Sequence, residues 1–242
     1  MDSKHSIIWG LLAACLLASS IPGDAQCSAT AGSIVAKFTF AGGTRAEALL
    51  DLGRQEKVCF GMRNLPREAF FESVSIDANH ETVAEIVSRI LQEPDVQVRS
   101  TSEKIVQVQR GPDKESLFDH RISSFTVPRG PLQSASLGIQ LRLARELDPS
   151  LGGFAGSFSP GDSTDLVGPF DEYNASVQHL LNLIVGASKG ASWIATVPDD
   201  YRLPGSPAQY PMWIILQYSA PVSGFRAILE NVGRDYPETK RP

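Results

Sequence analysis

The histidines are the residues best suited to acid–base or metal chemistry in this chain, but their spacing does not indicate a catalytic or metal site. His80, His120 and His179 lie in different segments, and none has metal-ligand spacing to another histidine, a cysteine or a carboxylate. Asp119 and His120 are adjacent, but a catalytic pair is defined by geometry and not by adjacency. We interpret these two residues as polar residues that precede a strand. We expect His179 on the solvated side of a helix.

Two short motifs that invite a catalytic interpretation lack the required context. Residues 155–159 contain a serine but miss a glycine that a nucleophile elbow requires. Residues 186–190 follow a predicted helix, whereas a phosphate-binding loop follows a strand. The sequence therefore predicts that the protein is not an enzyme and has no catalytic, cofactor-binding or metal-ligating residues. A hydrolase is the least favoured of the functions considered below.

The N-terminus has the three-part layout of a secretory signal. A short polar segment precedes an apolar run over residues 7–17, and small residues follow up to Ala25. This pattern predicts a signal peptide over residues 1–25 with cleavage after Ala25. The apolar run is shorter than the roughly 20 residues that cross a bilayer, which disfavours the alternative of an uncleaved anchor helix.

A second processing route competes with this cleavage. Residues 12–15, Leu-Ala-Ala-Cys, are similar to a bacterial lipobox, after which Cys15 would carry lipid. The segment before this motif is very short, and the apolar run continues beyond the cysteine. The sequence leaves both routes open, one giving a protein without a lipid and the other a lipid-anchored envelope protein.

Cys27 and Cys59 are the two cysteines that follow the predicted cleavage site. An even pair in an exported chain favours a disulfide. Closing a loop of about 30 residues in this way would contribute about 3 kcal/mol of stability. The alternative is that Cys59, within the apolar stretch at residues 58–60, is a buried thiol.

The charge of the chain argues against two classes of partner. The formal net charge is −5, and no basic cluster occurs. We therefore expect no nucleic-acid partner. No segment after the signal peptide is long and apolar enough to span a bilayer, so we also expect no membrane span in the mature chain.

The first half of the chain alternates strand and helix signals. Apolar side chains alternate over residues 34–40, which predicts a half-buried strand. Thr44 with Glu47, and Thr82 with Glu85, have the spacing of capping boxes at two helix starts. The second helix carries a continuous apolar stripe formed by Val83, Ile86, Val87 and Ile90. Further strands are predicted at residues 58–62, 74–76, 96–98 and 105–108.

The second half repeats residues of the first half at nearly constant offsets. Phe38 and Thr39 recur as Phe125 and Thr126, 87 positions later. The apolar stripe recurs 94 positions later as Val177, Leu180, Leu181 and Ile184. Two matched blocks in the same order favour duplication of one unit. A final hairpin is predicted from residues 193–197 and 212–218.

The predicted fold class is α+β, with two small two-helix-plus-sheet modules of βαββαβ-like order in tandem. The predicted organisation is a signal peptide at residues 1–25, a first module at 26–110, a linker at 111–116, a second and diverged module at 117–220, and a helix and tail at 221–242.

A Pro- and Gly-rich loop at residues 198–211 carries residue types that are common at binding hot spots. The candidate partner-binding residues are Tyr201, Arg202, Tyr210 and Trp213. The alternative is that the loop is a long unconstrained connection of the hairpin. Strand edges can accept a partner strand, and residues 212–218 are the first candidates for such a contact.

The order strand, helix, strand, strand, helix, hairpin resembles the short N-terminal domain of secretins and TonB-dependent receptors. Residues 38–49, 74–77 and 82–87 carry this resemblance, and the second unit matches it loosely. The resemblance implies a periplasmic fold used for protein–protein contact or signalling, without catalytic residues. Members of the family usually precede an outer-membrane barrel or pore-forming domain, which we do not expect here.

The sequence thus predicts an exported, non-catalytic interaction module or accessory of a cell-envelope assembly, located in the periplasm and bound to an envelope protein. One alternative is a periplasmic protein that binds a small ligand or a glycan in an apolar pocket near Trp193 and Trp213. A secreted protein is an alternative location. The sequence does not determine the oligomeric state.

Overall fold

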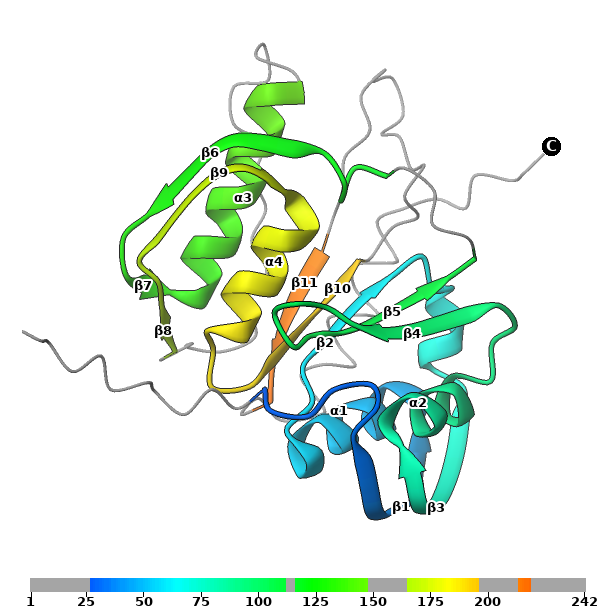
Figure 1. Cartoon of the computed structure of the whole chain (residues 1–242). Coiled ribbons are helices and arrows are strands. Elements are labelled where there is room, and N and C mark those ends of the chain that lie inside the picture. The colour runs from blue at the N-terminus through cyan, green and yellow to red at the C-terminus, as the bar shows by residue number, and fades with distance from the viewer. Residues whose placement is uncertain (1–26, 112–115, 148–164, 196–212, 219–242) are drawn as a thin grey trace, which may run out of the picture.

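The computed structural model describes residues 27–111, 116–147, 165–195 and 213–218 (Figure 1). The chain is an α+β protein, which confirms the predicted fold class. The predicted signal peptide, the lipobox with Cys15, residues 112–115 of the linker and the predicted helix after residue 220 lie outside the described residues.

The first half of the chain contains the strands and helices that the capping and periodicity signals predict. Its elements are β1 (Ile34–Thr44), α1 (Arg45–Glu56), β2 (Phe60–Arg63), the short 3-10 helix η1 (Arg67–Phe70), β3 (Ser73–Thr82), α2 (Val83–Leu91), β4 (Val96–Ser100) and β5 (Val106–Arg110).

The second half follows a similar order. Its elements are β6 (Arg121–Val127), β7 (Gly130–Pro131), α3 (Leu132–Leu147), β8 (Leu166–Val167), β9 (Phe170–Ser176), α4 (Val177–Gly186), β10 (Ala191–Ala195) and β11 (Trp213–Gln217). The described residues include no counterpart of β2 between α3 and β9.

Both predicted capping boxes form. The Thr44 hydroxyl accepts from the Glu47 N–H at 3.3 Å, and the Glu47 carboxylate accepts from the Thr44 N–H at 2.7 Å. Thr82 and Glu85 make the same reciprocal pair at the start of α2. These bonds satisfy backbone donors that a helix start leaves unpaired, so each strand can run directly into a helix.

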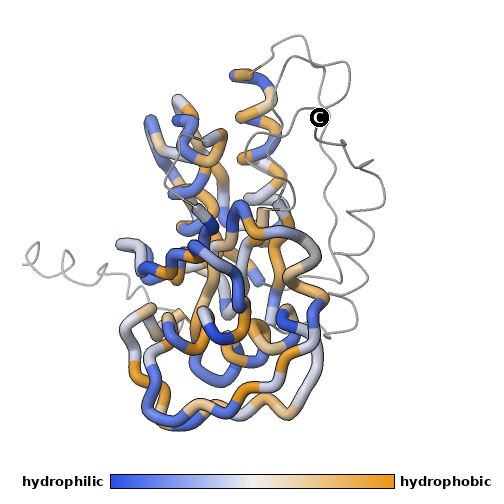
Figure 2. The backbone as a smooth tube through the Cα atoms, turned by 90° about the vertical axis from the view of Figure 1, so that its right-hand side faces the viewer, coloured by the Kyte–Doolittle hydropathy of each residue, from blue (hydrophilic) through white to orange (hydrophobic). Residues whose placement is uncertain are grey.

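The two long strand pairs have matching registers. β1 pairs with β3, and β6 pairs with β9, both antiparallel. The Thr39 hydroxyl contacts Asp77 at 3.4 Å, and the Thr126 hydroxyl donates to Asp171 at 2.9 Å. These strands alternate hydrophilic and hydrophobic residues, as seen along the lowest pair in Figure 2. Each pair buries one face and leaves the other to solvent.

Strands from both halves of the chain form one five-stranded sheet in the order β11-β10-β2-β5-β4. The parallel pairing of β10 with β2 joins the two halves, with Trp193 opposite Gly61 and Ile194 opposite Met62. The two predicted modules therefore share a sheet, and their buried side chains belong to a single hydrophobic core. Local periodicity did not indicate this shared sheet.

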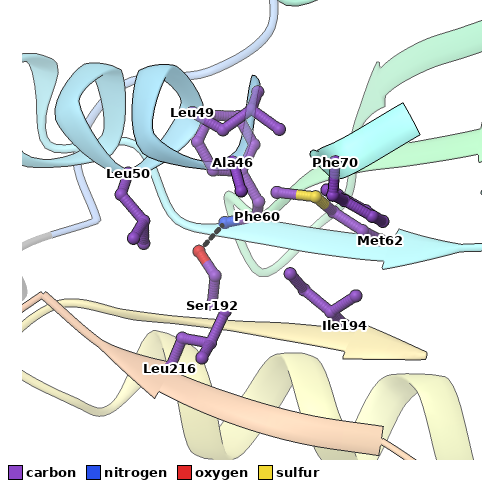
Figure 3. A pocket seen from close by; sticks show the side chains of 9 residues that line it. All are labelled: Ala46, Leu49, Leu50, Phe60, Met62, Phe70, Ser192, Ile194 and Leu216. Atoms are coloured by element: carbon purple, nitrogen blue, oxygen red, sulfur yellow. Dashed lines mark hydrogen bonds between the residues drawn. The ribbon is translucent and has the colours of Figure 1, made fainter. Parts of the chain in front are cut away.

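The helices of the two halves lie on opposite faces of this sheet (Figure 1). On one face, Phe60 and Ile194 point toward α1 (Figure 3). On the other face, the Trp193 indole N–H donates to Asn182 of α4 at 2.8 Å. Because neighbouring residues of a strand point to opposite faces, β10 supports α1 and α4 at the same time.

Gly61 is expected to tolerate no side chain at the junction of β2 and β10. A Cβ at this position would lie 2.7 Å from the indole Nε1 of Trp193. We predict that Gly61→Ala lowers the free energy of unfolding by about 1–3 kcal/mol, because a well-packed core must shift to admit the methyl group. Urea unfolding at neutral pH measures the change.

The matched control for this prediction is Gly32→Ala. A Cβ at Gly32 would meet no atom within 4 Å, so its unfolding free energy should stay within about 0.5 kcal/mol of the unchanged chain. Equal effects of the two substitutions would contradict the close contact between Gly61 and Trp193.

Candidate protein-interaction surface

The two end strands of the five-stranded sheet are β4 and β11. Among the described strands, none pairs with the outer edge of either one. An unpaired edge presents backbone N–H and C=O groups that can bind another strand. The chain before β11, and the chain after Tyr218, lie outside the described residues, whereas β4 is described together with both of its flanks. The surroundings of the β4 edge can therefore be specified in detail.

An open groove of about 520 Å³ lies beside β4, between this strand and α2. Val98 lines the groove from the strand side, and Ala84 and Ser88 line it from the helix side. Val98 and Ala84 are half-buried and pack against the core from its rim. The complete lining is Glu81, Ala84, Glu85, Ser88, Arg89 and Val98. The β4–α2 groove thus combines a backbone edge that no described strand pairs with and partly exposed apolar side chains.

The charged residues that line the β4–α2 groove are two glutamates and one arginine, which leaves a net charge of −1 among the lining residues. Arg89 is engaged by Glu81 at 2.5 Å and by the Asp77 carbonyl at 3.1 Å. The Glu85 carboxylate accepts from the backbone N–H and the hydroxyl of Thr82. These hydrogen bonds lower the pKa of Glu85, so its charge is present at neutral pH. The groove is suited to a segment that carries a basic residue.

The residues predicted for partner binding do not gather on a described surface. Tyr201, Arg202 and Tyr210 lie outside the described residues. Trp213 is described and is buried, with 6% of its surface exposed, which corrects the expectation that it contacts a partner. Its indole N–H donates to the Ser136 hydroxyl of α3 at 2.8 Å. Trp213 therefore anchors β11 to α3 and is not available on the surface.

The two tryptophans, near which an apolar pocket was expected, pack against a third aromatic ring. Trp193 is fully buried and stacks on Phe118 with ring centroids 5.5 Å apart. Trp213 contacts the same phenylalanine at 6.2 Å. These three rings form an aromatic cluster between the sheet and the helices of the second half. The cluster contributes to the hydrophobic core.

A small apolar cavity does occur on the opposite face of the sheet (Figure 3). It lies between α1 and strands β2, β10 and β11, and its volume is about 10 Å³. A cavity of this size holds about one water molecule. Its polar lining group is Ser192, whose hydroxyl accepts from the Phe60 N–H at 2.9 Å and lies 2.7 Å from the Tyr218 hydroxyl. Burial raises the pKa of Tyr218, so this phenol stays neutral.

Cys27 and Cys59 form a disulfide in the structure, with Cα atoms 5.3 Å apart. Both residues are buried, and the Cys27 sulfur also lies 3.9 Å from the Val185 carbonyl of α4. The bridge therefore fixes the start of the described chain beside β2 and against the second half.

His179 lies between two carboxylates, and 37% of its side chain remains exposed, as expected for the solvated side of α4. Its Nδ1 lies 2.7 Å from Glu103 in the β4–β5 turn, and its Nε2 lies 3.7 Å from Glu172 in β9. Glu103 belongs to the first half of the chain and His179 to the second. Periodicity placed His179 on the polar side of α4 but could not show that Glu103 of the first half lies beside it.

Asp119 and His120 have separate structural partners. Asp119 lies 3.5 Å from the buried guanidinium of Arg63 at the end of β2. His120 lies 3.3 Å from Glu146 near the end of α3. The structure shows no interaction between these two described residues. Asp119 instead attaches the start of the second half to β2, and His120 attaches it to α3.

Acid should destabilise the fold in part through Glu103. Burial alone would raise the pKa of Glu103, but hydrogen bonds from Thr101, from its own backbone, from His179 and from Ser102 together lower it below the usual 4.5. A depressed carboxyl pKa stabilises the fold above the unfolded-state value, and this contribution is lost as the pH falls through the folded-state value. We predict that Glu103→Gln costs stability at pH 7 and costs less at about pH 3.5.

Urea unfolding at the two pH values tests this prediction. Gln97→Ala, which removes a neutral and exposed side chain of β4, serves as the control, and its effect should be the same at both pH values. A Glu103→Gln effect that does not change with pH would contradict the role of the ionised carboxylate.

The described residues contain no group of three or more His, Cys, Asp or Glu side chains placed to hold a metal ion. No helix in the described ranges has the length and apolar character needed to cross a membrane. No protein-family model, curated protein or solved structure matches the chain. The sheet edge, the groove and the charges described above are the features of the described chain that bear on function.

Proposed function

We propose that this chain is an exported, non-catalytic protein-interaction module that serves as an accessory of a cell-envelope assembly. The observation that carries the proposal is the outer edge of β4, which has no partner among the strands that the structure describes, beside the β4–α2 groove. A strand edge with a neighbouring helix and partly exposed apolar side chains can bind an extended segment by backbone hydrogen bonds and read its side chains in the groove. The disulfide suits an exported protein, because oxidising compartments preserve such bonds.

A duplicated two-helix unit, similar to the short N-terminal domain of secretins and TonB-dependent receptors, supports the same proposal. Three features recur with the offsets found in the sequence. The Thr39–Asp77 contact recurs as Thr126–Asp171. The left-handed residue His80 recurs as Asn174, and the helix cap Thr82 as Ser176. Two such units placed in the periplasm would present their sheet edge to an envelope protein.

Binding of a small ligand or glycan has less support. Trp193 and Trp213 pack against Phe118 in the aromatic cluster, and the apolar cavity near α1 accommodates about one water molecule. A drug-sized ligand requires a pocket of about 300 Å³ or more that encloses most of its surface. The β4–α2 groove is large enough but open, which suits a peptide segment better.

Affinity capture followed by direct binding tests the proposed function. The mature chain, with its disulfide intact, is immobilised and exposed to envelope extracts of the source cells, with a reduced and unfolded sample as control. Each enriched protein is then purified and titrated with the chain by calorimetry. We expect at least one envelope protein to bind with a dissociation constant of about 10 μM or tighter, which corresponds to roughly −7 kcal/mol. Failure to find any direct binder would overturn the proposal.

A further inference from the structure

The second half of the chain contains a strand that corresponds to β4 and whose outer edge is occupied. β4 spans Val96–Ser100 and β10 spans Ala191–Ala195, so the two strands correspond with an offset of 95 positions. Each follows an amphipathic helix and starts a hairpin, β4 with β5 and β10 with β11. The outer edge of β10 binds β2 in parallel, whereas the outer edge of β4 has no partner among the described strands.

The contact between β10 and β2 also shows which residue of β10 faces α4, the helix that corresponds to α2. At an offset of 95, Trp193 of β10 corresponds to Val98 of β4. Trp193 points toward α4 and donates to Asn182, and Gly61 of β2 lies directly opposite, where no Cβ would fit. The large indole of Trp193 thus fills the space that a side chain at position 61 would occupy.

At the β4 edge the corresponding positions are smaller. Val98 takes the place of Trp193, and Ser88 takes the place of Asn182 at the helix offset of 94. These two residues line the β4–α2 groove. A strand bound to β4 in the manner of β2 would therefore have room for a side chain at the position where β2 has glycine.

We propose that the outer edge of β4 binds an extended segment of a partner protein, parallel to β4, which places an apolar side chain over Val98 and a basic side chain beside Glu85. The proposal rests on the proposed function and names the chemistry of its partner. The backbone edge supplies hydrogen bonds, the hollow over Val98 selects an aliphatic residue, and the negative excess of the groove favours a basic one.

The length of the bound segment is limited at one end. The Ser100 hydroxyl accepts from the Ala31 N–H at 2.8 Å, so the first described residues of the chain pass the end of β4. Val96 and Val98 remain along the edge. The partner segment therefore pairs along these residues and runs past the exposed side of α2.

A peptide derived from β2 tests the proposal, because β2 already binds the corresponding edge. The probe is a labelled peptide of residues 58–64 with the substitutions Cys59→Ser and Gly61→Leu, titrated into the mature chain by fluorescence anisotropy. We expect saturable binding that is at least tenfold tighter than for the same peptide with Gly61 retained. N-methylation of two consecutive central residues should weaken binding at least tenfold, because one of two successive N–H groups faces the β4 edge.

The variant Val98→Trp gives the sharpest control. It restores the indole found at Trp193, so it should bind the peptide with glycine at least tenfold more tightly than the peptide with leucine. Ser88→Trp, on the exposed side of α2, should weaken the leucine peptide even if Val98→Trp does not fold. Lys37→Trp on the exposed face of β1 should change neither affinity.

The outcomes separate this inference from the proposed function. Absence of saturable peptide binding, or binding that ignores N-methylation and both tryptophan variants in the groove, overturns the assignment of the β4 edge. If captured envelope proteins still bind the Val98→Trp and Ser88→Trp chains unchanged, the module binds through another surface and the proposed function stands. If no envelope protein binds at all, the proposed function itself fails.

Discussion

Replacing Trp193 by alanine is expected to lower the free energy of unfolding by about 3–5 kcal/mol. The side chain is fully buried, stacks on Phe118 and donates its indole N–H to Asn182. Truncation leaves a large cavity between the sheet and the helices of the second half, and it leaves a buried amide oxygen without its donor. Urea unfolding followed by circular dichroism measures the loss.

The control for this prediction is Trp193→Phe, which keeps an aromatic ring against Phe118 but removes the indole N–H. Its cost should be smaller than that of alanine and should include about 1–3 kcal/mol for the unpaired Asn182 oxygen. The alanine variant should also unfold in a single transition, because strands of both halves share the sheet. A cost below about 1 kcal/mol for alanine would contradict the buried position of Trp193.

Removing the Cys27–Cys59 disulfide is expected to cost about 3–4 kcal/mol. The bridge spans 32 positions, and in the chain-entropy model a cross-link of that span restricts the unfolded chain substantially. The double variant Cys27→Ala/Cys59→Ala should therefore unfold at a lower urea concentration than the oxidised chain.

Chemical reduction of the unchanged chain provides the comparison for the double variant. Both should lower stability, and mass spectrometry of the oxidised chain should show a loss of two hydrogens relative to the reduced chain. The double variant should not respond to reductant. Equal stability of the oxidised and reduced chains would contradict a stabilising disulfide.

The sequence was informative where the determining interactions are local. Thr44 and Glu47 lie three positions apart, and their reciprocal hydrogen bonds require nothing beyond one helical turn. The apolar stripe beginning at Val83 also depends on local spacing, because residues three and four apart share a helix face. Predictions of this kind succeeded for the described helices and for most of the described strands.

The arrangement of the sheet depends on contacts between distant residues and could not be predicted from periodicity. Nothing in the alternation of β2 indicates that Gly61 lies opposite Trp193, although an isolated glycine in a strand is typical of close packing. The burial of Trp213 was missed for the same reason, since aromatic residue type suggests binding and core packing equally. The groove beside Val98 depends on where β4 ends the sheet, which local sequence does not indicate.

The parallel pairing of β2 with β10 implies an order of folding as the chain is synthesised. Gly61 meets a residue at position 193, so one side of β2 stays open until the second half of the chain has emerged and folded. Such long-range pairing slows folding, and an open apolar edge promotes aggregation in the meantime. Cys27 and Cys59 both emerge before β10, so the early disulfide would hold the beginning of β2 in place while its edge waits for the later strand.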